Sequence, residues 1–190
     1  MADASDLNPA FAVVALIGAA VIALAAGCGG QRSDAANDKG DSETVTVTID
    51  GQEITRTYPT MKVQIGEHTF VMKLALDNAT RAQGLGGMTK KQIGDGMLFV
   101  FPGAAHQSFW MKGCIEDVDI AFVSPAGRIT AIHRMKAQPL DTPESQLRRY
   151  PSAFAALAAL EFNAGTLDKL KLKPGDKVVL PLESLKQRAR

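Results

Sequence analysis

The first group in this sequence that could do chemistry is a thiol. The chain contains two cysteines, Cys28 and Cys114. If Cys28 is lipidated or cleaved away, Cys114 has no intramolecular partner, and a lone thiol in an exported protein is a candidate nucleophile. It would need a base, His106 or His133, to form the thiolate. We favour the alternative that Cys114 is a small buried core residue, because cysteine is among the most buried residue types.

A second candidate is a soft-metal site. Met111, Cys114, His133 and Met135 offer thioether, thiol and imidazole ligands of the kind that suit Cu(I). His133 and Met135 are two residues apart, so on a strand they face the same side. A compact ligand motif such as Cys-x-x-Cys is absent, and methionines at such positions are more often core residues. We therefore predict no metal site and no cofactor.

The third candidate is a cluster of charged residues, each flanked by apolar residues: Arg81, Asp119 and Glu161. A buried charge must be paired or reach solvent, because unpaired burial costs several kcal/mol. One interpretation is an ion pair between Arg81 and Asp119 that fixes a helix on a sheet. The other is a ligand pocket with apolar walls from Trp110 and Tyr150, in which Arg81 binds an anion. Two carboxylates could also hydrolyse a glycosidic bond if their separation were correct.

The charge balance excludes one class of partner. Lys plus Arg number 21 and Asp plus Glu number 20, so no large basic surface for nucleic acid is expected.

The N-terminal segment indicates membrane attachment. Residues 11–26 are all apolar or glycine, and as a helix they would span roughly 24 Å, against ~30 Å for a hydrocarbon core. The sequence Leu24-Ala25-Ala26-Gly27-Cys28 is similar to a bacterial lipobox, which predicts lipidation at Cys28. Asp3 and Asp6 replace the usual positive charges of a signal peptide, so an uncleaved anchor helix stays open as the alternative.

A polar tether follows the apolar segment. Residues 29–44 contain no aromatic or large aliphatic side chain, so they cannot bury enough surface to offset the entropy of ordering. The predicted organisation is a signal peptide or anchor over 1–28, a flexible tether over 29–44, a folded domain over 45–185 and a basic tail over 186–190. We expect the domain to stand outside the cytoplasm, anchored to the membrane of a bacterial cell envelope.

The folded part is predicted to be mainly β with a few short helices, an α+β protein. Alternation of apolar and polar residues and short apolar runs bounded by Gly, Pro and Asp indicate many short strands, as in a barrel or sandwich. Residues 152–160 are ambiguous, because alanine favours a helix and uniform apolarity favours a buried strand. Helices are predicted over 78–85 and 166–170. The predicted strands span 44–49, 52–58, 61–65, 69–76, 97–101, 108–111, 118–123, 128–135 and 177–180.

A series of short motifs lies along the predicted folded domain. They are Thr80-Arg81, Gly84-Leu85, Gly96-Met97-Leu98-Phe99-Val100-Phe101, Phe109-Trp110-Met111-Lys112, Asp119-Ile120-Ala121-Phe122, Gly127-Arg128-Ile129, Tyr150-Pro151-Ser152, Leu160-Glu161, Gly165 and Gly175-Asp176. In order and spacing, the chain from Leu74 to Val179 resembles the Domain of Unknown Function 192 family, small and often exported proteins. The resemblance implies a compact, mostly antiparallel β-barrel with short helices, and it implies no established activity.

Together these features predict a non-enzymatic binding or accessory module with a small-molecule or protein ligand. The candidate pocket residues are Arg81, Trp110, Asp119, Tyr150 and Glu161. The alternative is a hydrolase-like enzyme that uses Asp119 and Glu161, or the thiol of Cys114.

Overall fold

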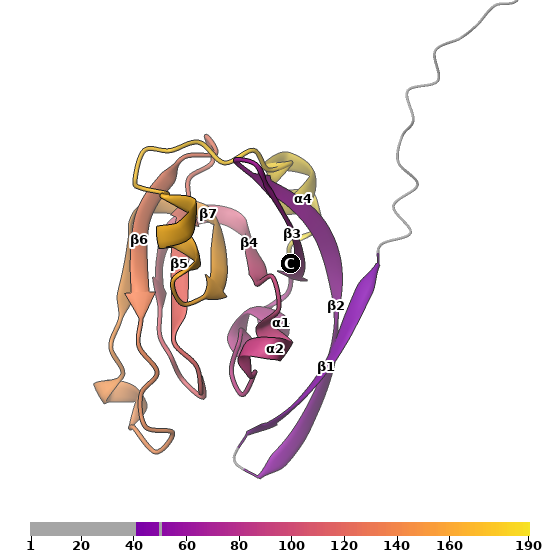
Figure 1. Cartoon of the computed structure of the whole chain (residues 1–190), viewed down its shortest axis with the longest axis vertical. Coiled ribbons are helices and arrows are strands. Elements are labelled where there is room, and N and C mark those ends of the chain that lie inside the picture. The colour runs from indigo at the N-terminus through magenta and orange to yellow at the C-terminus, as the bar shows by residue number, and fades with distance from the viewer. Residues whose placement is uncertain (1–40, 50) are drawn as a thin grey trace, which may run out of the picture. The chain divides into compact units, whose positions relative to one another are not determined.

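The structure is a computed structural model that describes residues 41–49 and 51–190 (Figure 1). Its strands are β1 (Ser42–Ile49), β2 (Gln52–Ile65), β3 (His68–Ala75), β4 (Met97–Phe109), β5 (Val118–Val123), β6 (Ile129–Met135) and β7 (Tyr150–Asn163). Its helices are α1 (Asn78–Gln83), α2 (Lys90–Ile93), the 3-10 turn η1 (Glu144–Gln146), α3 (Thr166–Leu170) and α4 (Leu182–Arg188).

The predicted N-terminal features lie mostly outside this description. The signal or anchor segment 1–28, with the lipidation candidate Cys28, is not among the described residues, and neither is most of the tether. β1 begins at Ser42, inside the range predicted as tether. Over residues 41–49 and 51–190, no helix combines the length and the apolarity that a membrane crossing requires.

The strands form one seven-stranded sheet in the order β1-β2-β3-β4-β7-β5-β6. Every pairing is antiparallel except the one between β3 and β4, so the prediction of a mainly β, mostly antiparallel fold with short helices is confirmed. β1 and β6 are the two edges of this order, and no ladder in the described part of the chain joins them. The sheet is therefore open, and the predicted closed barrel is not confirmed.

Both faces of the central strands are covered. Phe99 of β4 belongs to one apolar cluster, whereas its neighbours Leu98 and Val100 belong to the other. Successive side chains of a strand point to opposite faces, so the sheet separates the two clusters. Coverage on both sides explains why Met97–Val100 reads as an unbroken apolar run, as expected for a doubly buried strand.

The helices divide between the two faces. Leu85, which follows α1, and Ile93 of α2 pack in the cluster that contains Phe99. Leu167 of α3 and Leu185 of α4 pack in the cluster that contains Leu98. Figure 1 shows α1 and α2 between β4 and the long β1–β2 hairpin, where Gln92 Nε2 donates to the carbonyl of Thr46 at 2.9 Å.

The ambiguous alanine-rich segment is a strand. β7 lies between β4 and β5, and its residues 156–162 are buried, which accounts for the absence of a polar face. The strands predicted over 97–101 and 108–111 are largely one element, because β4 continues to Phe109 through a register shift between Val100 and Ala105.

Near the C-terminus one predicted strand is wrong, and one helix was not predicted. Residues 177–180 do not form a strand, because Lys177 makes only an isolated bridge with Arg128. Helix α4 was not predicted, and it includes Lys186 and Arg188 of the predicted basic tail. The backbone N–H of Arg190 donates to the carbonyl of Leu76 at 2.9 Å.

Candidate functional site

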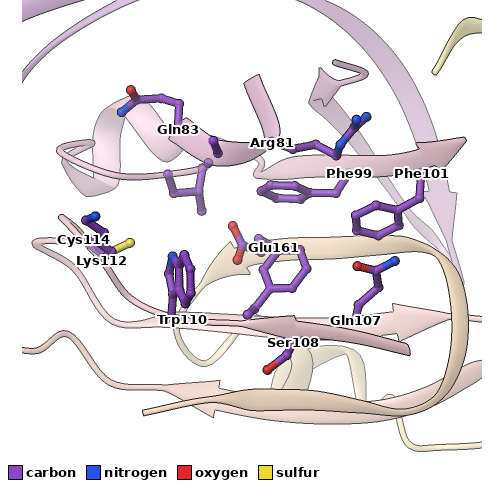
Figure 2. Close-up of a pocket in the computed structure, with 14 residues that line it drawn as sticks. Arg81, Gln83, Phe99, Phe101, Gln107, Ser108, Trp110, Lys112, Cys114 and Glu161 are labelled. Carbon is purple, nitrogen blue, oxygen red and sulfur yellow. The ribbon is translucent and has the colours of Figure 1, made fainter. Parts of the chain in front are cut away.

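A cavity of about 440 Å³ lies between α1 and the strands β4 and β7 (Figure 2). Four aromatic side chains line it: Phe99, Phe101, Phe109 and Trp110. The other lining residues are Arg81, Ala82, Gln83, Gly84, Leu85, Gln107, Ser108, Lys112, Cys114 and Glu161. The cavity is thus apolar in its walls, with polar and charged groups at a few positions.

Local hydrogen bonds hold α1 over the cavity. The helix begins after Asp77, whose side chain accepts from the N–H of Thr80 at 2.9 Å, while the N–H of Asp77 donates to the Thr80 hydroxyl. This reciprocal cap lowers the pKa of the Asp77 carboxyl, mainly through the backbone hydrogen bond from Thr80. The predicted helix over 78–85 thus begins where α1 begins and extends two residues beyond its end at Gln83. Beyond its end, Gly87 N–H donates to the carbonyl of Gly113 at 2.7 Å, which ties this wall to the Trp110–Cys114 segment.

The aromatic wall is a set of edge-to-face contacts centred on Phe109. Its ring centroid lies 5.0 Å from that of Phe99 and 5.4 Å from that of Phe122, with interplanar angles of 81° and 77°. Such T-shaped pairs are a favourable geometry for aromatic rings. Phe101 adds a third contact at 6.4 Å. The wall is therefore held by its own packing before any ligand enters.

Glu161 supplies the acidic group of the cavity. It is 5% exposed, and no hydrogen bond or ion pair reaches its carboxyl oxygens from the described residues. Figure 2 shows this carboxyl pointing into the space between Phe99 and Trp110. Burial raises the pKa of Glu161 to about 8, because the charged form loses its hydration. A buried carboxyl without a partner in a cavity marks a candidate binding group.

Cys114 also lines the cavity, but its surroundings suppress its reactivity. The thiol is 8% exposed, and burial, with the nearby Glu161 carboxyl, raises its pKa to about 12. The thiolate needed for nucleophilic attack is thus disfavoured. The candidate base His133 lies elsewhere, with its Nε2 at 2.7 Å from the carbonyl oxygen of Pro151. The other candidate, His106, is exposed on β4 and does not line the cavity.

The predicted ion pair between Arg81 and Asp119 is wrong. Arg81 donates to the Val100 carbonyl at 3.0 Å, to Asn78 Oδ1 at 2.6 Å and to the main-chain oxygen of Arg190 at 2.7 Å. Its guanidinium also lies 5.9 Å from the ring centroid of Phe101. Arg81 lines the cavity, and main-chain and amide oxygens hold its guanidinium there.

Asp119 has a different position and partners. It is 2% exposed and accepts the N–H groups of Gly165 at 2.7 Å and Leu167 at 3.0 Å. Arg134 Nε donates to its other oxygen at 3.2 Å. The alternation of β5 places Asp119 on the face of Ala121, and α3, not the helix α1 that carries Arg81, covers that face. Asp119 is therefore outside the cavity and holds the start of α3.

Tyr150 also lies outside the cavity. It is 2% exposed, and its hydroxyl accepts the N–H of Lys136 at 3.1 Å. Of the five predicted pocket residues, the structure brings together Arg81, Trp110 and Glu161. The sequence reasoning missed the three phenylalanines. The two-residue spacing of Phe99 and Phe101 on one strand was the signal that could have found two of them.

The soft-metal candidates do not form a cluster with acidic or further imidazole ligands. Across residues 41–49 and 51–190, no group of three or more His, Cys, Asp or Glu side chains could hold a metal ion. Met111 and Met135 are 1% and 0% exposed and pack in the apolar cluster with Cys114.

These features define a class: an open-sheet α+β domain with an aromatic pocket that encloses an unpartnered carboxyl. A family model for the Domain of Unknown Function 192, described as an uncharacterised ACR, matches residues 61–180. The match covers more than half of the chain, and the chain belongs to this family.

Two solved structures are similar to the chain. One is a protein of unknown function from Novosphingobium aromaticivorans, with 27% identity and a TM-score of 0.52 over 73% of this chain and 93% of that one. The other is a putative transcription regulator from Sinorhizobium meliloti, with 28% identity and a TM-score of 0.49 over 74% of this chain and 94% of that one. No curated protein matches the chain.

Proposed function

We propose that this domain is a non-enzymatic module that binds a small molecule with an apolar part in the aromatic cavity. The observation that carries the proposal is the partnerless carboxyl of Glu161 among aromatic rings. A volume of about 440 Å³ is in the range of small-molecule sites, which combine apolar walls with a few placed polar groups.

The geometry gives less support to the hydrolase alternative. Glu161 lines the cavity, whereas Asp119 faces α3 on the other side of the sheet, so the two carboxyls cannot flank one bond. The raised pKa of Cys114 and the separate hydrogen bond of His133 leave the thiol without an activating base. A binding site needs neither arrangement.

Binding can be followed through Trp110, the single tryptophan of the chain, which lines the cavity. The full-length protein is titrated with the neutral naphthalene dye prodan, and energy transfer from Trp110 to the dye is recorded. We expect saturable transfer at one dye per chain. Phe101→Ala removes an aromatic wall and should weaken the affinity about tenfold, in line with the lost apolar contact area.

The matched control is Phe154→Ala. Phe154 is 67% exposed and does not line the cavity, so its removal should leave the affinity unchanged. Absence of transfer, or equal losses in both variants at unchanged stability, would contradict the proposed site.

We further propose that the module is held at the bacterial cell envelope through its N-terminal segment, by lipidation at Cys28. In cells, Cys28→Ala should release the domain from the membrane fraction or block its maturation, whereas Cys114→Ala should do neither. A Cys28→Ala protein that stays membrane-bound with unchanged processing would argue for the anchor helix instead.

A further inference from the structure

We infer that the ligand of this cavity carries a cationic nitrogen, an ammonium or quaternary ammonium group, which pairs with the Glu161 carboxylate between the aromatic rings. This inference rests on the proposed binding function and names the chemical class of the ligand.

The cavity contains one acidic group that has no partner of opposite charge. Glu161 is buried, its carboxyl points into the cavity, and the described residues give it no hydrogen bond or cationic partner. A buried carboxylate is costly unless it is paired. A cation in the adjacent space would supply the missing partner, and a ligand without one would leave the carboxyl either protonated or unpaired.

The surface around that carboxyl is largely aromatic. Phe99, Phe109 and Trp110 line the same cavity, and a cation over an aromatic face is attracted by the ring quadrupole. Two rings of this site already attract cations: Arg149 lies 3.5 Å from the Trp110 centroid, and Arg81 lies 5.9 Å from that of Phe101. Arg149 is not among the residues that line the cavity.

The basic residues that line the cavity already have partners elsewhere in the protein. Arg81 donates to three oxygen atoms of the protein, at Val100, Asn78 and Arg190. Lys112 pairs with Glu144 at 2.7 Å. These two cations are therefore satisfied, and neither is paired with Glu161. The group that lacks a partner in the cavity is acidic, so the complementary ligand charge is positive.

Binding of a cation beside Glu161 should depend on pH. The ionisable groups that line the cavity with Glu161 are Arg81, Lys112 and Cys114. Cys114 has a pKa of about 12 and stays neutral, and Arg81 stays charged although burial lowers its pKa. Because burial raises the pKa of Glu161 to about 8, a cation must displace a proton at neutral pH. Its affinity should rise about tenfold per pH unit up to about pH 8 and then level off.

The test uses two isosteric probes on the full-length protein. Benzyltrimethylammonium is a cation that does not titrate, and neopentylbenzene replaces its nitrogen with carbon. Both are titrated against Trp110 emission from pH 5.5 to 9, a range that extends to both sides of the Glu161 pKa of about 8. We expect the cation to bind more tightly than the isostere above pH 7, with the stated pH slope. Glu161→Gln should abolish the slope and weaken cation binding at pH 8.5 by at least about tenfold.

The matched control is Glu116→Gln, which removes a partly exposed carboxyl outside the cavity and should keep the pH slope. If the isostere binds as tightly as the cation at every pH, the inference fails while the proposed apolar site stands. If prodan binds at the cavity but the cation does not bind, the inference fails in the same way. If neither prodan nor either probe reaches Trp110, both the inference and the proposed function fail.

Discussion

Replacing Glu161 with glutamine should stabilise the protein at alkaline pH and have little effect at acid pH. Burial raises the pKa of the folded-state carboxyl from the ordinary value of 4.5 to about 8. Between these values the native state binds more protons than the unfolded chain, so the free energy of unfolding falls as the pH rises. The full interval corresponds to about 5 kcal/mol, which is large beside the 5–15 kcal/mol of a typical domain.

Denaturant unfolding of the wild type and Glu161→Gln from pH 4 to 9 checks this result. The difference between the two proteins reports on Glu161 alone. Other carboxyls such as Asp77 and Asp117, whose lowered pKa values act in the opposite direction, are common to both proteins. We expect the curves to meet near pH 4.5 and to be fully separated above pH 8. Parallel curves would mean that the pKa of Glu161 is the same in the folded and the unfolded protein, and would contradict this prediction.

Replacing Gly96 with alanine should be among the most damaging single substitutions. Gly96 has a φ of +112°, and an added Cβ would lie 2.2 Å from the carbonyl oxygen of Glu161. The strain of that backbone conformation and the clash with main-chain atoms each cost about 1–3 kcal/mol, so we expect a loss of about 4 kcal/mol. The clash is with β7 next to the cavity, so prodan affinity should fall as well.

Gly103→Ala is the control for this substitution. Gly103 has no atom within 4 Å of an added Cβ and no positive φ, so its unfolding midpoint should change little. Thermal and denaturant unfolding of both variants measure the difference. Equal stability of Gly96→Ala and wild type would show that β4 and β7 are farther apart at this point than the structure has them.

Strands with one exposed face were the easiest elements to predict. Residues 44–49 alternate between threonine and apolar side chains, and β1 has the matching alternation of exposed and buried positions at Thr44–Val47. The central strands lose this signal because both of their faces are buried. The alanines of β7 therefore left its secondary structure ambiguous, and the segment is a strand because it pairs with its neighbours β4 and β5.

The site was predictable only in part for a related reason. Local sequence indicated that Arg81, Asp119 and Glu161 carry charge among apolar neighbours, but not which helix covers which face of the sheet. That choice places Glu161 under α1 and Asp119 under α3. The partners of Arg81 are main-chain and amide oxygens, one of which lies 109 residues away, and no side-chain pattern encodes such contacts.

The position of β7 in the sheet has a consequence for how the chain folds. β7 pairs on one side with β4 and on the other with β5, and both of these strands precede it in the sequence. During synthesis, β4 and β5 therefore lack their shared partner strand until residues 150–163 have emerged. Until then the two halves of the sheet, β1–β4 and β5–β6, each keep an unpaired strand edge. Such non-local pairing slows folding, and open strand edges favour association between chains. A nascent chain that ends before β7 should therefore depend on chaperones, and Glu161 reaches its cavity only in this late step.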